Sequence, residues 1–335
     1  MLERNQKIID AIIEKATREY PGILAMVGIY GSFLTGDIHE KSDLDLLILI
    51  NDPKGYELAR TVILDDENIG HDLYCTSWEA LEHDAAFRHP HIAKLMDSKI
   101  VYFADECHRT RLDALRKQAM EADTRPAAEE ALRNAECAFA KAMLTADLAS
   151  CRAAAGEMVY QLNAAIALLN KRYFRLGTRR LFHEINSMER KPEHYQDLVT
   201  DMISAKDLSE LKSAAAELLR SVEDLFRSPA PEAKVYPGTY EEMFSNWRNK
   251  MYLAAEINDP YLSFECLGNL DFLLKELGFV WNIMDQYDAE NLSATAKAFD
   301  TVLERYREEY RKACIEVQRY ATVDAFIAEY MKKKA

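Results

Sequence analysis

Glycine and proline are scarce in this chain, at 11 and 9 of 335 residues. An all-β protein needs many tight turns, and these two residues usually supply them, so the composition excludes an all-β fold. The second half is instead rich in alanine, leucine, glutamate and arginine, which are strong helix formers. We therefore expect a mostly helical chain.

Paired cysteines and long apolar runs are also missing. The six cysteines are scattered without a C-x-x-C pair, which is typical of reduced thiols and not of a disulfide framework or a zinc site. The most apolar run, residues 44–50, is far too short to cross a bilayer. These features predict a cytoplasmic protein with no membrane partner.

Positive charge is in the minority, because 42 Lys and Arg stand against 56 Asp and Glu, for a formal net charge of −14. Such a chain offers no general basic surface for nucleic acid or for an anionic membrane. Nucleic acid is therefore not the expected partner, and a small cationic molecule fits better. The 49% hydrophobic content still supports a sizeable core and excludes a mainly disordered protein.

The first third of the chain mixes helical and strand patterns. Apolar residues at helical spacing predict a helix over residues 3–19, which Pro21 and Gly22 end. Short apolar runs predict strands, and these lie at residues 24–30, 43–50, 69–75 and 99–104. Together these elements predict a first domain over residues 1–115.

No strand of comparable quality is predicted after about residue 106. Helices predicted at 126–149, 150–175 and 207–227 form a second domain, a helical bundle over residues 120–228. Three prolines between residues 228 and 238 mark a linker before a C-terminal helical region, residues 235–335. The expected fold class is α+β: a small mixed β-sheet domain flanked by helices, followed by an all-α helical-bundle region.

Two carboxylates stand at the start of the strand predicted at residues 43–50. Asp43 and Asp45 are two positions apart, so they project from the same face of the strand, about 6.6 Å apart along it. Burying two adjacent carboxylates without cationic partners is strongly unfavourable. A bound divalent cation resolves the conflict, and oxygen ligands are what Mg²⁺ prefers when it also binds phosphates.

A glycine-serine pair and a third carboxylate complete this constellation. Gly31 and Ser32 follow a predicted strand and open a short turn, so their N–H groups and the Ser32 hydroxyl can receive phosphate oxygens. Asp72 lies on the strand predicted at residues 69–75, and neighbouring strands lie about 4.8 Å apart, so its carboxylate can reach the same metal. Two metal ions held by three carboxylates suit in-line displacement at phosphorus.

This pattern resembles the nucleotidyltransferase superfamily, which includes DNA polymerase β and the aminoglycoside and lincosamide nucleotidyltransferases. The resemblance covers about residues 20–105 and rests on Gly31-Ser32, ten intervening residues, Asp43-Leu44-Asp45 and a later Asp72. It implies that Asp43, Asp45 and Asp72 are catalytic and bind Mg²⁺, as two ions. It also implies that Gly31 and Ser32 hold the nucleoside triphosphate substrate, which is ATP.

Residues 165–195 are similar to the helical substrate domain of kanamycin nucleotidyltransferases. That family places a glutamate general base, closely followed by a phosphate-binding lysine, on the preceding helix. The resemblance implies Glu136 as the base and Lys141 as the nucleotide-binding lysine, although their spacing of five departs from the one-turn spacing of the family. Glu130 and Glu157 are alternative bases, and Asp72 is a further candidate to take the proton of the acceptor.

These observations predict a Mg²⁺-dependent enzyme of the adenylyltransferase type. It would transfer AMP from ATP to a hydroxyl of a small cationic acceptor, such as an aminoglycoside- or lincosamide-like antibiotic, and release pyrophosphate. One alternative is a regulator of the toxin–antitoxin type that modifies a protein or RNA. An inactive nucleotide-binding module is disfavoured, because all three acidic positions and the glycine-serine turn are present. A homodimer is compatible with the enzymatic interpretation.

Overall fold

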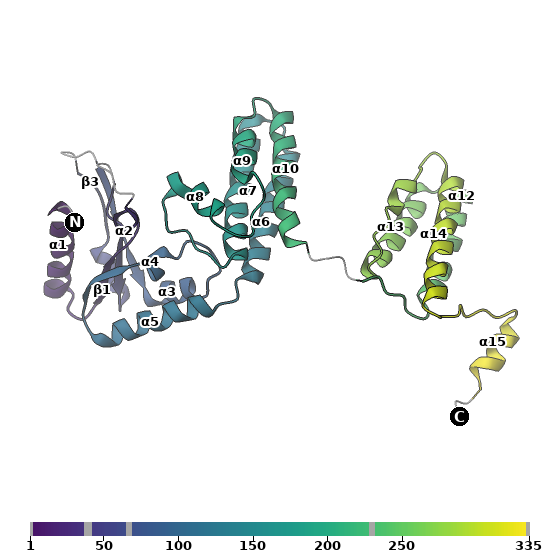
Figure 1. Ribbon diagram of the computed structural model, residues 1–335, viewed down its shortest axis with the longest axis horizontal. Coiled ribbons are helices and arrows are strands. Elements are labelled where there is room, and N and C mark those ends of the chain that lie inside the picture. The colour runs from purple at the N-terminus through teal and green to yellow at the C-terminus, as the bar shows by residue number, and fades with distance from the viewer. Residues whose placement is uncertain (1–2, 37–41, 65–68, 228–231, 333–335) are drawn as a thin grey trace. The chain divides into compact units, whose positions relative to one another are not determined.

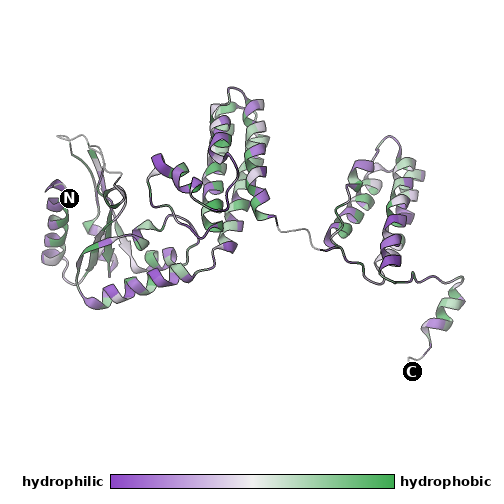
Figure 2. Cartoon of the chain, viewed as in Figure 1, coloured by the Kyte–Doolittle hydropathy of each residue, from purple (hydrophilic) through white to green (hydrophobic). Residues whose placement is uncertain are grey.

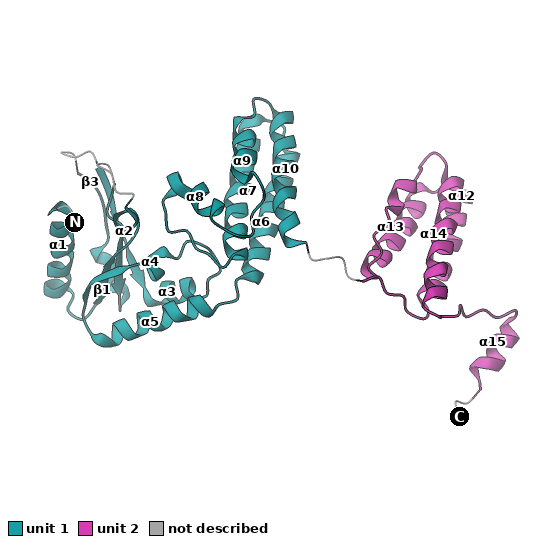
Figure 3. Cartoon of the chain, in the orientation of Figure 1, with its two compact units in different colours: residues 1–227 teal, residues 228–335 magenta. Residues whose placement is uncertain are grey.

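The computed structural model describes residues 3–36, 42–64, 69–227 and 232–332 of the chain. The chain divides into two compact units, residues 1–227 and 228–335 (Figure 3). The linker predicted around the prolines begins at this boundary, and its first four residues, 228–231, lie outside the described residues.

Unit 1 contains a four-stranded mixed sheet in which the strands lie in the order β5-β2-β1-β6. Strand β1 of this sheet is labelled in Figure 1. The central strand β1 (Leu24–Ile29) pairs antiparallel with both β2 (Leu46–Ile50) and β6 (Lys99–Phe103). The edge strand β5 (Cys75–Ser77) runs parallel to β2. Every residue of β1 and β2 is buried, as their continuous apolar sequences predict for strands covered on both faces.

The prediction of one strand over residues 69–75 was wrong in its extent. β4 (Ile69–Leu73) pairs antiparallel with β3 (Arg60–Leu64) in a separate two-stranded sheet, and β5 starts after Tyr74. Strand β3 was not predicted, because four of its five side chains are exposed and no buried face imposes an alternating apolar pattern. The strand predicted from residue 43 begins at Leu46.

Helices cover both faces of the four-stranded sheet. The helix predicted at residues 3–19 is confirmed as α1 (Glu3–Glu19), and it packs on the face that carries Val27 and Ile48. Three helices pack on the other face, around Leu47: α3 (Trp78–Ala85), α4 (Ala93–Met96) and α5 (Glu106–Glu121). This arrangement leaves the ends of the strands to carry polar groups.

A helical bundle completes unit 1. Its helices share one alanine-rich core and are α6 (Arg125–Leu144), α7 (Leu148–Leu169), α9 (Tyr195–Ser204) and α10 (Leu208–Phe226). The small side chains of alanine let α6 and α7 approach closely. The short α8 (Leu181–Asn186) lies in the connection between α7 and α9. The long helices agree with the predicted helices at 126–149, 150–175 and 207–227, apart from their ends.

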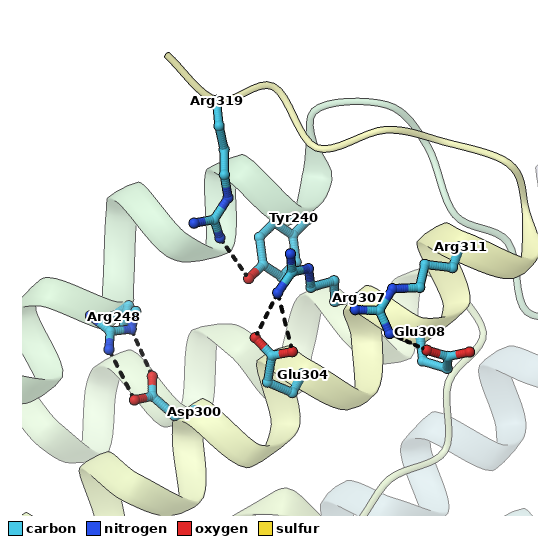
Figure 4. Close-up of polar contacts among 8 residues, drawn as sticks. All are labelled: Tyr240, Arg248, Asp300, Glu304, Arg307, Glu308, Arg311 and Arg319. Atoms are coloured by element: carbon cyan, nitrogen blue, oxygen red, sulfur yellow. Dashed lines mark hydrogen bonds and ion pairs between the residues drawn. The ribbon is translucent and has the colours of Figure 1, made fainter. Parts of the chain in front are cut away.

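Unit 2 is helical, as the C-terminal region was predicted to be. Its elements are α11 (Thr239–Met243), a π-helical turn (Phe244–Arg248), α12 (Asn249–Ile257), α13 (Pro260–Glu276), a 3-10 turn (Ile283–Gln286), α14 (Leu292–Lys312) and α15 (Val323–Tyr330). Arg248 forms a bidentate ion pair with Asp300 of α14, with N–O distances of 2.7 and 3.0 Å (Figure 4). Such a two-bond pair fixes geometry as well as charge, and it ties the start of α12 to α14.

Hydrophilic and hydrophobic stripes alternate along the helices, as on α5 and α14 (Figure 2). This pattern is typical of helices that bury one face and expose the other. Within the described parts of the chain, no helix is both long and apolar enough to span a membrane. All six cysteines are free thiols.

Candidate active site

One cavity in unit 1, of about 580 Å³, is lined by most of the predicted site residues. Its wall includes Gly31, Ser32, Asp43 and Asp45. It also includes residues from α4 and from the segment between α7 and α8. The volume lies within the range of about 300–1,000 Å³ that is usual for small-molecule sites.

Alternating burial directs the two aspartates into this cavity. Leu44 and Leu46 are 2% and 3% exposed and pack in the core beneath α1. In an extended segment the intervening side chains point the other way, so Asp43 and Asp45 face the cavity. The predicted common face of the two carboxylates therefore holds, although both residues precede β2.

Gly31 allows the chain to turn tightly against Asp45. It connects β1 to the short helix α2 (Ser32–Thr35). Its backbone angles, φ 70° and ψ −148°, are rarely adopted by residues other than glycine. A Cβ atom at Gly31 would lie only 1.9 Å from Oδ2 of Asp45. The backbone N–H of Ser32 donates a hydrogen bond to the Asp45 carboxylate. The turn ends at Gly36.

The electrostatics of the carboxylate pair favour a cation. Burial raises the pKa of Asp45 above its ordinary value, the nearby charge of Asp43 raises it further, and the Ser32 N–H partly opposes both effects. The two residues thus offer hard oxygen ligands whose mutual repulsion a divalent ion would relieve. This donor set fits Mg²⁺.

Two tyrosines line the cavity beside the aspartates. The hydroxyls of Tyr30 and Tyr74 lie 3.1 Å apart. Burial is the main cause that raises the pKa of Tyr30, and the hydrogen bond to Tyr74 adds to it. Tyr30 therefore stays a neutral hydroxyl at physiological pH and is available as a hydrogen-bond donor.

The structure does not bring Asp72 into the wall of the cavity. Asp72 lies on β4, and its carboxylate accepts a 2.8 Å hydrogen bond from the Thr61 hydroxyl on β3. The parallel ladder of β2 and β5 begins at Ile48 and Cys75, so its register does not extend to Asp45 or Asp72. Tyr74, two residues after Asp72, lines the cavity.

Glu136 and Lys141 also lie outside the wall of the cavity. Glu136 is on the exposed face of α6. The Lys141 Nζ atom is 3.2 Å from the carboxylate of Glu157 on α7. One helical turn after Glu157, the ring of Tyr160 stacks on His91 of the cavity wall, with centroids 5.5 Å apart and planes 11° from parallel.

Several basic side chains in the cavity were missed by the sequence analysis. Residues 175–180, which we call the arginine strap, contribute Arg175, Arg179 and Arg180, and α4 contributes Lys94. The signal in the sequence was three arginines within six residues, inside the segment that resembles the kanamycin enzymes. Because the strap has no regular periodicity, only the tertiary fold places it beside Asp43 and Asp45.

A further polar cluster lies next to the cavity, on α3 and the loop after it. His83, Asp84 and His89 place their polar atoms within 4.8 Å of one another. The buried Asp84 carboxylate lies 3.3 Å from Nε2 of His89 and 3.4 Å from Nζ of Lys94. The backbone N–H of His91 donates to Nδ1 of His89, so in the neutral ring Nε2 carries the proton and faces Asp84. The cluster thus holds Lys94 in place.

Two family models match parts of the chain. Residues 9–102 match the model of the nucleotidyltransferase domain, and residues 137–230 match that of the KNTase C-terminal domain. No curated protein matches the chain. Among solved structures, a nucleotidyltransferase-like protein from Exiguobacterium sibiricum 255-15 is similar, with 11% identity, 91% of each chain covered and a TM-score of 0.35.

The two matched domains meet at the described cavity, because Asp43 and Asp45 come from the first and the arginine strap from the second. Together they support an NTP substrate, an acceptor and a divalent metal in general terms. The chain is thus an enzyme of the nucleotidyltransferase superfamily, and it resembles the aminoglycoside nucleotidyltransferases of the kanamycin type.

Proposed function

We propose that this enzyme transfers AMP from ATP to a hydroxyl of a small cationic acceptor and releases pyrophosphate. The observation that carries the proposal is the joint presence of the Asp43–Asp45 pair and the Gly31-Ser32 turn in one cavity. The carboxylates would hold Mg²⁺, which supplies Lewis-acid activation of the α-phosphate. The N–H groups and hydroxyl of the turn would bind phosphate oxygens.

In the proposed reaction the acceptor oxygen attacks the α-phosphorus in line with the leaving group. A new P–O bond forms, the bond from the α-phosphorus to the bridging oxygen breaks, and that oxygen leaves with pyrophosphate. The proton of the acceptor hydroxyl passes to a carboxylate base. The chain's net charge of −14 supports a cationic acceptor, because it attracts such a molecule at long range.

Asp72 is included in the proposal as a third metal ligand. Its place two residues before Tyr74, which lines the cavity, supports this role. In the described conformation Thr61 holds its carboxylate, so binding a metal would exchange that hydrogen bond for coordination. The number of ions, two in the proposal, follows from the resemblance.

Incubating the full chain with Mg²⁺ and ATP labelled on either the α- or the γ-phosphate tests this function. The acceptors would be aminoglycosides, lincosamides, tRNA and a cell lysate. We expect the α-label on a small acceptor and the γ-label in pyrophosphate, with neither from Asp43→Asn. Labelling of only a protein or RNA would favour the regulatory alternative, and no transfer to any acceptor would overturn the proposal.

We propose that the general base is a glutamate of the helical bundle, and the contacts favour Glu157 over Glu136. Glu157 lies one turn from Tyr160, which stacks on the cavity residue His91, whereas no such link is described for Glu136. We expect Glu157→Gln to lower kcat about 100-fold, the usual scale for losing a general base. Glu136→Gln is the matched control and should stay near the parent rate. The reverse pattern would assign the base to Glu136.

A further inference from the structure

The arginine strap is held in place by contacts on both sides. On one side, the buried side chain of Glu184, 7% exposed, accepts hydrogen bonds from the backbone N–H groups of Arg175 and Leu176 at 2.9 and 3.0 Å. A carboxylate that accepts two N–H bonds inside the protein leaves little freedom to the segment that donates them. Glu184 therefore fixes where the strap begins.

On its other side the strap is tied to the sheet domain. Nε of Arg175 lies 3.0 Å from the Asp97 carboxylate, which also accepts a 2.9 Å hydrogen bond from the Tyr173 hydroxyl. The backbone N–H of Phe174 donates to the carbonyl of Pro90 at 2.9 Å. These bonds join the helical bundle to the segment around α4. They therefore fix the strap relative to the cavity that Asp43 and Asp45 line.

The basic groups of this cavity are suited to an anion. Arg175, Arg179, Arg180 and Lys94 line it together. Guanidinium groups form paired hydrogen bonds with phosphate oxygens and remain charged at any physiological pH. Lys94 and Arg175 are each restrained by a carboxylate, Asp84 and Asp97, so they lose little conformational freedom when a ligand binds.

We propose that the arginine strap is the subsite for the β- and γ-phosphates of the nucleotide, and hence for the pyrophosphate that leaves. This inference rests on the proposed function and adds a second phosphate site, apart from the Gly31-Ser32 turn. Glu184 is its positioning residue: it touches no substrate and acts by holding the backbone of Arg175 and Leu176. Charge that develops on the leaving group would be stabilised by the strap.

Binding of pyrophosphate and of AMP to the full chain in EDTA tests the subsite without metal or catalysis. The variants are the double substitution Arg179→Ala with Arg180→Ala, the single substitution Glu184→Gln, and Arg220→Ala on α10 as the control. We expect the double variant to bind pyrophosphate at least about 10-fold more weakly, the scale of one lost charge-assisted hydrogen bond. Arg220→Ala should bind like the parent.

Comparison of the two ligands separates positioning from general loss of structure. Glu184→Gln should weaken pyrophosphate binding severalfold while AMP binding stays within twofold, because AMP lacks the β- and γ-phosphates. A misfolded variant would lose binding to both ligands, and a lowered unfolding midpoint would identify it. If Glu184→Gln misfolds in this way, Glu184→Asp is used in its place. Equal pyrophosphate binding by the parent and the double variant would overturn the inference.

The same set of proteins distinguishes failure of this inference from failure of the proposed function. Asp43→Asn should abolish transfer yet bind pyrophosphate in EDTA at least as well as the parent, because the strap remains intact. If the parent transfers no nucleotide but the strap variants lose pyrophosphate binding, the subsite is supported and the proposed function is rejected. If the strap variants transfer nucleotide normally and bind pyrophosphate like the parent, the proposed function is supported and the subsite is rejected.

Discussion

Asp45→Asn is expected to reduce nucleotidyl transfer about 10³-fold, because it removes an anionic ligand at the point where metal and phosphate charge meet. The substitution is nearly isosteric, and the amide oxygen can still accept the hydrogen bond from the Ser32 N–H. The initial rate of transfer at saturating Mg²⁺ and ATP measures the effect. Asp113→Asn, on the exposed face of α5, is the matched control and should retain the parent rate.

The same variant is expected to be at least as stable as the parent at pH 7 in EDTA. Burial and Asp43 raise the pKa of Asp45, so the folded chain binds this proton more tightly than the unfolded chain does. The free energy of unfolding of the parent therefore falls as the pH rises through the raised pKa of Asp45, and Asn removes that loss. Denaturant unfolding at pH 4 to 8 measures it. A variant markedly less stable than the parent at pH 7 would contradict the view that the charge of Asp45 destabilises the folded chain.

Gly31→Ala is expected to abolish transfer and to destabilise unit 1. The added Cβ would lie 1.9 Å from Oδ2 of Asp45, so the carboxylate or the turn must move. The backbone there, at φ 70° and ψ −148°, adds strain of about 1–3 kcal/mol for a residue with a side chain. Transfer rate and denaturant unfolding measure the two effects together.

Gly36→Ala is the control for Gly31→Ala. Gly36 also has a positive φ, 77°, but a Cβ there would meet nothing within 4 Å. It should therefore lose some stability and keep its activity. If Gly36→Ala and Gly31→Ala lowered transfer equally, the close approach to Asp45 would not explain the need for Gly31.

Local patterns were sufficient to predict that Asp43 and Asp45 face the same side of the chain. Leu44 alternates with Asp43 and Asp45, and this alternation directs the carboxylates to one side even though the strand itself starts only at Leu46. Gly31 was predicted to offer its N–H group to phosphate oxygens. The structure adds a reason for glycine at this position, the close approach of Asp45.

The basic half of the site could not be predicted in the same way. Arg175 reaches the cavity because Glu184 and Asp97, nine residues later and 78 residues earlier, hold its backbone and its side chain. No local periodicity encodes such contacts. Similarly, the predicted strand breaks at Tyr74 because its first half, β4, pairs with β3 and its second half, β5, pairs with β2. Only the tertiary fold determines these two partners.

The central claim is that Asp43 and Asp45 hold the metal that binds the nucleotide, and calorimetric titration of ATP without an acceptor tests it most directly. Four titrations are needed, of the parent and of Asp43→Asn, each with Mg²⁺ and with EDTA. We expect Mg²⁺ to strengthen ATP binding by the parent at least about 10-fold, in line with the effect of losing a metal contact. Asp43→Asn should show little or no such gain. An equal gain from Mg²⁺ in the two proteins would contradict the claim.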